Sequence, residues 1–175
     1  MKKNLVTNLR EITRVFVSFP CVLVSCSYEG KDNIISIGMV HIFSFNPPLI
    51  GIGVAPSRYS YSLIKNSREF VINIPNKDMV EIVNFCGEKT GKEVDKFKEM
   101  NLTKEKASKV NCPRIKECPV NLECKVKYEF ETGDHTWFIG EILACYVAEN
   151  YQREDNLLYW GGKYYSIGKV IKIRY

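Results

Sequence analysis

One long segment, residues 120–131, alternates apolar and polar side chains without a break, and this pattern constrains the fold more than any other feature. Every second position is apolar: Val120, Leu122, Cys124, Val126, Tyr128 and Phe130. Successive side chains of a β-strand point to opposite faces, so the pattern predicts a long strand with one buried face and one exposed face. Gly133 and Asp134 follow and are typical of a hairpin turn. The sequence therefore predicts a long antiparallel hairpin.

The returning segment, residues 137–147, is apolar at both alternating sets of positions apart from Glu141. A strand of this kind is covered on both faces. A chain of 175 residues has little material of its own for a second cover. We therefore expect a homodimer whose interface crosses this strand.

Shorter β-rich segments occupy much of the remaining chain. Strands are expected at residues 21–27, 33–41, 49–54 and 69–74, and short helices at residues 60–66, 77–85 and 94–100. Pro47 and Pro48 cannot donate ladder hydrogen bonds, so they mark a boundary between two strands. Residues 151–175 are expected to form a loop and a last strand. Closing this antiparallel sheet removes its exposed edges, so we predict a β-barrel that forms one domain over residues 1–175.

Neither the charge distribution nor the hydropathy pattern indicates a nucleic-acid-binding or membrane protein. The formal net charge of +5 comes from 25 basic and 20 acidic residues scattered along the chain. The densest lysine segment, residues 89–109, is interrupted by acidic residues and is interpreted as a solvated helical surface rather than a nucleic-acid site. We find no apolar segment typical of a signal peptide or a membrane span, so a cytoplasmic protein with no membrane partner is expected.

The cysteines do not suggest a metal site. They are Cys21, Cys26, Cys86, Cys112, Cys118, Cys124 and Cys145. Their number is odd, and none of them form a C-x-x-C pair. We expect reduced thiols that pack as small hydrophobic side chains, and no bound metal.

Several segments in co-linear order resemble the flavin reductase-like family of FMN-binding split barrels. They are residues 20–25, 30–38, 44–50, 56–64 and 69–75. Residues 90–97 and 133–141 are similar in particular to the flavoredoxin-like branch. The resemblance implies a mainly β fold: a six-stranded antiparallel split β-barrel of Greek-key topology with a few short peripheral helices. It also implies a homodimer that binds FMN close to the subunit interface.

The resemblance places the flavin phosphate at Ser57, Arg58, Ser60 and Ser62. An arginine fork and the free N–H groups at the start of a helix both suit a phosphate. The alternative is that the serines merely cap the helix beside a solvated arginine, and the local sequence alone favours it. The resemblance reverses that preference for Arg58 and Ser60.

The resemblance places the flavin itself along the strand of residues 33–41. The cofactor-binding residues implied there are Asn33, Ser36, Ile37, Gly38, Met39 and Val40. A glycine at position 38 lets a flat ring approach the backbone closely. The alternative for Ser36 and Gly38 is a strand bulge without a ligand. Many relatives carry a larger aromatic side chain where Met39 stands.

Two further positions are assigned by the resemblance. His135 corresponds to a histidine beside the flavin or nicotinamide and is the candidate catalytic residue; the alternative is a turn histidine without a function. Lys92 belongs to a segment, with Lys89, Thr90 and Lys96, that relatives place near the opening of the site. The alternative for these residues is a solvated helix surface.

The sequence offers no nucleophile–base pair or metal cluster, which agrees with chemistry carried out by a redox cofactor. The leading hypothesis is an oxidoreductase in which NADH or NADPH reduces bound FMN, and FMN then reduces free flavin, ferric iron or a protein. One alternative is a flavoredoxin-like electron carrier reduced by a redox protein partner. A second is a flavin-free β-barrel binding module.

Overall fold

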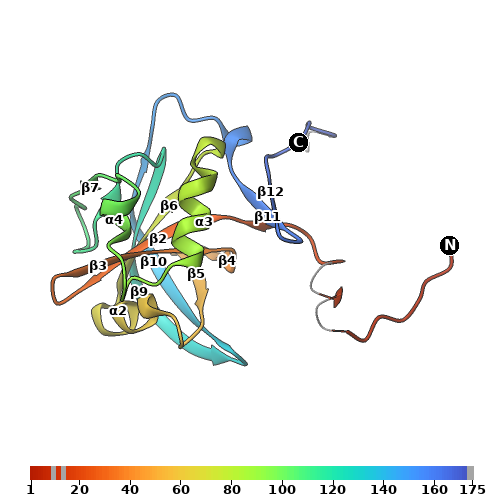
Figure 1. Cartoon of the computed structure of the whole chain (residues 1–175), viewed down its shortest axis with the longest axis horizontal. Coiled ribbons are helices and arrows are strands. Elements are labelled where there is room, and N and C mark those ends of the chain that lie inside the picture. Colours follow the sequence, from red (N-terminus) through yellow and green to blue (C-terminus); the bar gives the residue numbers. More distant parts are fainter. Residues whose placement is uncertain (9–10, 13–14, 173–175) are drawn as a thin grey trace.

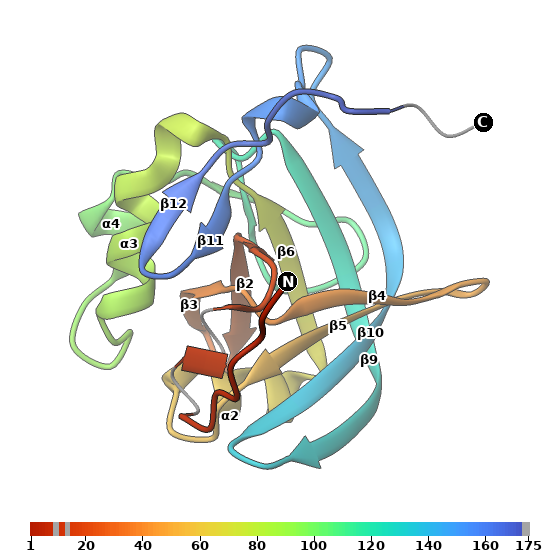
Figure 2. The ribbon, with the colours of Figure 1, turned by 90° about the vertical axis from the view of Figure 1, so that its right-hand side faces the viewer.

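Seven strands form one antiparallel sheet in the order β3-β2-β6-β9-β10-β5-β4. The computed structural model describes residues 1–8, 11–12 and 15–172. The strands are β2 (Val22–Tyr28), β3 (Lys31–Ile37), β4 (Val40–Phe45), β5 (Pro48–Val54), β6 (Glu69–Ile74), β9 (Val120–Thr132) and β10 (His135–Val147). Only Gly38 and Met39 separate the two edge strands, β3 and β4. The sheet therefore has to curl until its edges meet, which makes the predicted barrel (Figure 2).

The prediction of one strand over residues 33–41 is wrong, because β3 ends at Ile37 and β4 begins at Val40. The chain leaves one edge of the sheet at Gly38 and joins the other edge. A Cβ atom on Gly38 would lie 3.4 Å from Phe19 Cβ, so the N-terminal segment packs directly against this corner. The six strands that the family resemblance implies become seven because β3 and β4 divide one of them.

The helices lie outside the barrel and agree in position with the sequence. They are α2 (Tyr59–Ser67), η1 (Lys77–Met79), α3 (Val80–Glu88) and α4 (Lys96–Glu99). Leu63 and Ile64 of α2 are buried, as their spacing predicts. The third helix is shorter than residues 94–100, because the Asp95 side chain accepts hydrogen bonds from Phe97 N and Lys98 N and so begins the helix at Lys96. Figure 1 shows α3 and α4 on the side of β3.

Two buried clusters lie on opposite faces of β2 and β3. The barrel interior contains Phe70 and Phe138, both fully buried. A second cluster, which includes Leu23, Ile34 and Val83, lies between these strands and the helices. Strands β2 and β3 are therefore covered on both faces, and this packing holds them in place beside α3.

The alternation along β9 predicts one buried face, but a bulge divides it. Val126 pairs with Gly140, whereas Tyr128 pairs with Ile139, so the register shifts at Lys127. A bulge transfers the residues beyond it to the other face. Tyr128 and Phe130 are consequently 60% and 42% exposed, and the prediction that they are buried is wrong.

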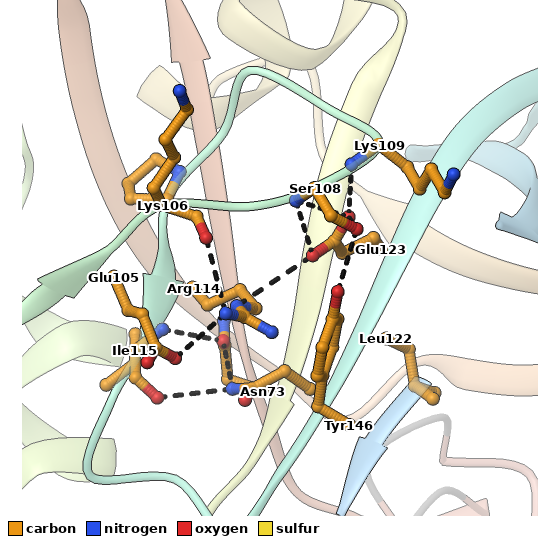
Figure 3. Close-up of polar contacts among 12 residues, drawn as sticks. Asn73, Glu105, Lys106, Ser108, Lys109, Arg114, Ile115, Leu122, Glu123 and Tyr146 are labelled. Atoms are coloured by element: carbon orange, nitrogen blue, oxygen red, sulfur yellow. Dashed lines mark hydrogen bonds and ion pairs between the residues drawn. The ribbon is translucent and has the colours of Figure 1, made fainter. Parts of the chain in front are cut away.

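Glu123, predicted on the exposed face of β9, is completely buried. Residues 103–118, which include the short strands β7 (Lys104–Glu105) and β8 (Arg114–Ile115), fold over this face. The Glu123 carboxylate accepts hydrogen bonds from the backbone N–H groups of Ser108 and Lys109, with a shortest distance of 2.7 Å (Figure 3). The Arg114 guanidinium lies 3.8 Å from this carboxylate and 3.7 Å from the centre of the Tyr146 ring. The folded-over segment is therefore attached by a buried ion pair.

The C-terminal tail packs back on the body as predicted, but it forms a two-stranded hairpin rather than a loop and a single strand. After η2 (Arg153–Asp155), β11 (Leu158–Trp160) and β12 (Lys163–Tyr165) pair with each other, and β11 also pairs with β1 (Phe19–Pro20). Gly161 and Gly162 have φ angles of +58° and +82°, which suit glycine in a tight turn. The hairpin lies beside α3 in Figure 2.

Within residues 1–8, 11–12 and 15–172, no group of three or more His, Cys, Asp or Glu side chains could hold a metal ion. None of the helices in this part of the chain is long and apolar enough to cross a membrane. Six cysteines are buried free thiols, and Cys145 is an exposed one.

Candidate functional site

Two adjoining clefts lie between β3, the start of α2 and the end of α3. The small cleft has a volume of about 80 Å³ and the large cleft about 520 Å³. Arg58, Gly87 and Glu88 line both. The two volumes therefore belong to one site with two compartments.

The start of α2 forms one wall of the small cleft. The chain turns after β5 with a hydrogen bond from Arg58 N to Ala55 O, and α2 begins at Tyr59. Among the described residues, no side chain caps this helix end. The first N–H groups of a helix lack intrahelical partners and carry partial positive charge. This wall is therefore suited to an anion.

Asn33 of β3 lies in the small cleft and is 3% exposed. Its Nδ2 donates a hydrogen bond of 2.8 Å to Ser60 Oγ. Its Oδ1 is buried and finds no hydrogen-bond partner in the part of the chain that the structure describes. A Cβ atom on Gly91 would collide with this oxygen, so glycine lets the loop after α3 close over Asn33. A buried polar atom without a partner is costly, and a bound ligand with a donor group would satisfy it.

Lys96 forms the floor of the small cleft and is only 3% exposed. Its Nζ donates hydrogen bonds of 2.7 Å to Ile34 O on β3 and to Cys86 O on α3. Burial lowers the pKa of Lys96 below its ordinary value. The interpretation of Lys96 as part of a solvated surface is wrong, because α4 packs its side chain against β3. No local pattern distinguishes Lys96 from the neighbouring lysines.

Lys92, which the resemblance assigns to the cofactor site, is exposed and does not line either cleft. Its backbone N–H donates to Thr90 Oγ1 at 3.4 Å. Lys89 and Thr90 do line the small cleft. Of the four residues of this segment singled out in the sequence, the fold thus brings three into the cleft and leaves Lys92 on the adjoining surface.

The two clefts differ in charge. In the described structure, the charged side chains lining the small cleft are Arg58, Lys89, Lys96 and Glu88. Those lining the large cleft are Arg58 and Glu88. The small cleft therefore carries an excess of positive charge, whereas the large cleft is balanced. An anionic group is favoured in the first and an uncharged group in the second.

The large cleft lies between β3, α3 and the C-terminal hairpin. Ser36, Ile37 and Gly38 line it from β3, as do Tyr159 and Tyr164 from the hairpin. The Ser36 hydroxyl donates to Val83 O of α3. The space in front of the Gly38 Cα is taken by Phe19 and Pro20 rather than left open.

Three other sequence-assigned residues lie outside the two clefts. Met39 packs against Gly53 on the far side of the corner, and Val40 packs against the barrel core. Ser62 is exposed and donates to Tyr59 O at 3.1 Å within α2. The clefts therefore bring together Asn33, Ser36, Ile37, Gly38, Ser57, Arg58 and Ser60.

His135 also lies outside the clefts, at the start of β10. Its Nδ1 is 2.7 Å from Asp134 Oδ1, and this hydrogen bond holds the pKa of the Asp134 carboxyl below its ordinary value. The neighbouring Thr136 pairs with Val54, the last residue of β5. His135 therefore lies near the loop that leads to Arg58 and α2.

Comparison with known proteins decides the family. Residues 14–168 match the family model described as a flavin reductase like domain. The chain belongs to the flavin reductase-like family. An uncharacterized protein of Archaeoglobus fulgidus is 43% identical over 113 residues, which are 65% of this chain and 64% of that protein. The chain thus spans slightly less than two thirds of that relative.

Two further similar proteins are informative. A flavoredoxin from Methanosarcina acetivorans has the same fold, with a TM-score of 0.87 and 30% identity over 99% of this chain and 95% of the flavoredoxin. An NADH-dependent FAD reductase of Streptomyces globisporus is 22% identical over 156 residues, which cover 88% of this chain and 83% of the reductase. The similarity to the flavoredoxin confirms the split-barrel fold and the resemblance to flavoredoxins.

Proposed function

We propose that this protein is an oxidoreductase that binds FMN across the two clefts, accepts hydride equivalents from NADH or NADPH, and passes electrons to free flavin, ferric iron or a protein. The observation that carries the proposal is the small positive cleft that opens past Arg58 into a larger, charge-balanced cleft. This arrangement matches a ligand that has an anionic end and a flat, uncharged ring.

The residues of the small cleft fit a phosphate ester. Arg58 would supply a forked donor, and the start of α2 would supply backbone N–H groups. Ser57 and Ser60 would add hydroxyl donors. The buried Asn33 Oδ1 would accept from a hydroxyl or N–H group of the same ligand.

The flavin, when bound, supplies the redox chemistry, because its ring takes up a hydride and gives up electrons. This chain's residues would bind and orient it. Lys96 holds β3 and α3 at a fixed separation through its two carbonyl partners. The positive charge of Lys96 also favours an anion in the small cleft. The Ser36 to Gly38 segment would lie along the ring, in the cleft that α3 and the hairpin also line.

A second candidate is an FMN electron carrier that a protein partner reduces. The similarity to a flavoredoxin along nearly the whole chain favours it. The similarity to an NADH-dependent reductase supports the enzyme instead. A flavin-free binding module remains the third hypothesis, and an anion cleft with a buried, unsatisfied amide oxygen argues against it.

We also propose that the protein acts as a homodimer, with an interface on the outer face of the sheet near β10. The bulge in β9 places Tyr128 and Phe130 on this face, beside Trp137 and Ile139. Phe43, which is 44% exposed, packs against Trp137 with ring centres 5.4 Å apart. Aromatic side chains grouped on one exposed face are typical of a protein interface.

An absorbance spectrum of the purified protein tests the flavin, followed by anaerobic addition of NADH and then NADPH. Rapid bleaching of a yellow protein by either donor is the expected result. A yellow protein that neither donor bleaches would favour the electron carrier. A colourless protein that takes up no added FMN would refute flavin binding altogether.

Sedimentation velocity at micromolar concentration tests the homodimer. Tyr128→Lys and Phe130→Lys would each place a charge on the proposed interface, and the expected result is dissociation. Tyr165→Lys, on the C-terminal hairpin, is the control. A wild-type protein that sediments as a monomer would refute the interface.

A further inference from the structure

We propose that the C-terminal hairpin forms the binding wall for the nicotinamide ring of the electron donor: Tyr159 and Tyr164 stack against this ring, and Asn84 binds its carboxamide. The proposal rests on the proposed function, because it assigns a place to the substrate that would reduce the flavin. It concerns a cleft wall outside the expected phosphate and flavin-ring contacts.

The geometry of the hairpin points to this role. Tyr159 of β11 pairs directly with Tyr164 of β12, and both side chains line the large cleft. Their ring centres are 5.5 Å apart, with an interplanar angle of 60°. Two adjacent aromatic rings beside a cleft offer a planar ligand both a face and an edge. The hairpin therefore forms an aromatic wall opposite the Ser36 to Gly38 segment.

The charge of the large cleft agrees with a neutral ring. Its charged lining residues in the described chain, Arg58 and Glu88, are of opposite sign. Reduced nicotinamide is an uncharged ring whose one strongly polar substituent is a carboxamide. Asn84 also lines this cleft and offers both an amide donor and an amide acceptor. One asparagine can therefore pair with a carboxamide through two hydrogen bonds.

The attachment of the hairpin allows a ring to enter. The base of the hairpin is fixed where Cys21 N donates to Leu157 O at 3.0 Å, and Leu157 is only 4% exposed. Towards α3, Tyr164 Oη donates to Asn84 Oδ1 at 3.5 Å, the outer limit for such a bond. A ligand amide can replace this weak contact while the base stays attached.

The hairpin carries its own control on the opposite face. Tyr165 pairs with Leu158, and its ring contacts Trp160 at 6.2 Å between centres. The described residues that line the large cleft include neither Tyr165 nor Trp160. A Tyr165→Leu substitution removes the same ring from the same hairpin without changing the proposed wall.

The experiment uses the full-length protein loaded with FMN. The probe is 1,4,5,6-tetrahydro-NAD, an analogue that cannot donate a hydride, and its Kd is measured from the change in flavin absorbance. Loss of one stacked ring in Tyr159→Leu or Tyr164→Leu should raise this Kd about 3- to 10-fold. Tyr164→Phe keeps the ring and should bind the probe like the wild type. The Kd of FMN, measured by quenching of flavin fluorescence, should change less than about 2-fold in every variant.

Three results with the variants would overturn the proposal. The first is an unchanged probe Kd in both Tyr159→Leu and Tyr164→Leu. The second is an equal loss in Tyr165→Leu, which would show that the hairpin fold matters rather than the stacked rings. The third is a parallel loss of FMN affinity, which would show that the wall holds the flavin itself. A wild-type protein that binds FMN but not the probe would also overturn this proposal and leave the electron carrier, whereas failure to bind FMN would refute the proposed function first.

Discussion

Lys96→Met tests whether the buried ammonium holds the floor of the small cleft together. The substitution keeps the length of the side chain and removes two hydrogen bonds of 2.7 Å to Ile34 O and Cys86 O. A hydrogen bond to a charged group contributes about 1.5–3 kcal/mol, so the gross loss is about 3–6 kcal/mol. Relief of the desolvation of the ammonium offsets part of this loss. We expect the free energy of unfolding to fall by about 2–4 kcal/mol.

Urea unfolding followed by circular dichroism measures this change, with Lys98→Met as the control. Lys98 lies on the same short helix, and its side chain is exposed. The control should change the free energy of unfolding by less than about 0.5 kcal/mol. For a domain of this size, the loss at Lys96 corresponds to a decrease in Tm of roughly 4–16 °C. Equal stability of the two variants would refute the view that Lys96 joins β3 to α3.

Arg58→Ala should weaken FMN binding roughly 10- to 100-fold through loss of charged hydrogen bonds, and an unchanged Kd in a fluorescence titration would contradict the phosphate assignment. His135→Ala should lower turnover with NADH or NADPH more than FMN affinity; equal losses in stopped-flow and titration assays would indicate a structural role. Glu123→Gln should lower the free energy of unfolding by about 3 kcal/mol, the scale for breaking a buried ion pair, and a urea midpoint like that of the wild type would contradict this. Burial raises the pKa of Cys86 to about 11 and that of Cys26 to about 12, from an ordinary value of 9.0. Above pH 9 the unfolded chain loses thiol protons that the folded protein keeps. The contribution of these thiols to the free energy of unfolding is therefore complete below pH 9, and it is lost as the pH rises from 9 through about 11 for Cys86 and about 12 for Cys26. Each thiol should cost up to about 1.4 kcal/mol per pH unit in this window, and urea unfolding in reducing buffer should show a shallower pH dependence in Cys26→Ala.

Strand positions were predictable where they depend on local rules. The β9–β10 hairpin follows from alternation and from the turn at Gly133, and it is present at the expected residues. The strand boundary expected at Pro47 and Pro48 is present, because β4 ends at Phe45 and β5 begins at Pro48. Helix α2 begins within one residue of its predicted start. In each case the deciding residues lie within a few positions of one another.

The faces of β9 were not predictable in the same way. Tyr128 continues the apolar alternation, yet a bulge moves it to the outer face. Glu123 has a typical exposed position in the pattern, yet residues 103–118 cover it. A bulge depends on the register with a neighbouring strand, and a cover depends on a segment elsewhere in the chain. Neither is encoded in the alternation itself.

The sequence alone predicted the β9–β10 hairpin, the boundary at Pro47 and Pro48, and the segments that resemble a flavin site, but it missed the corner at Gly38 and Met39. Tertiary packing places Lys96, and not Lys92, in the small cleft, since the Lys96 ammonium binds a carbonyl 62 positions away in the chain. It also decided that Asn33 Oδ1 is buried without a partner in the described structure, because α2 and the loop at Gly91 meet over it. Periodicity is a local property of the chain, whereas burial and the direction of a polar atom depend on which distant segments pack together.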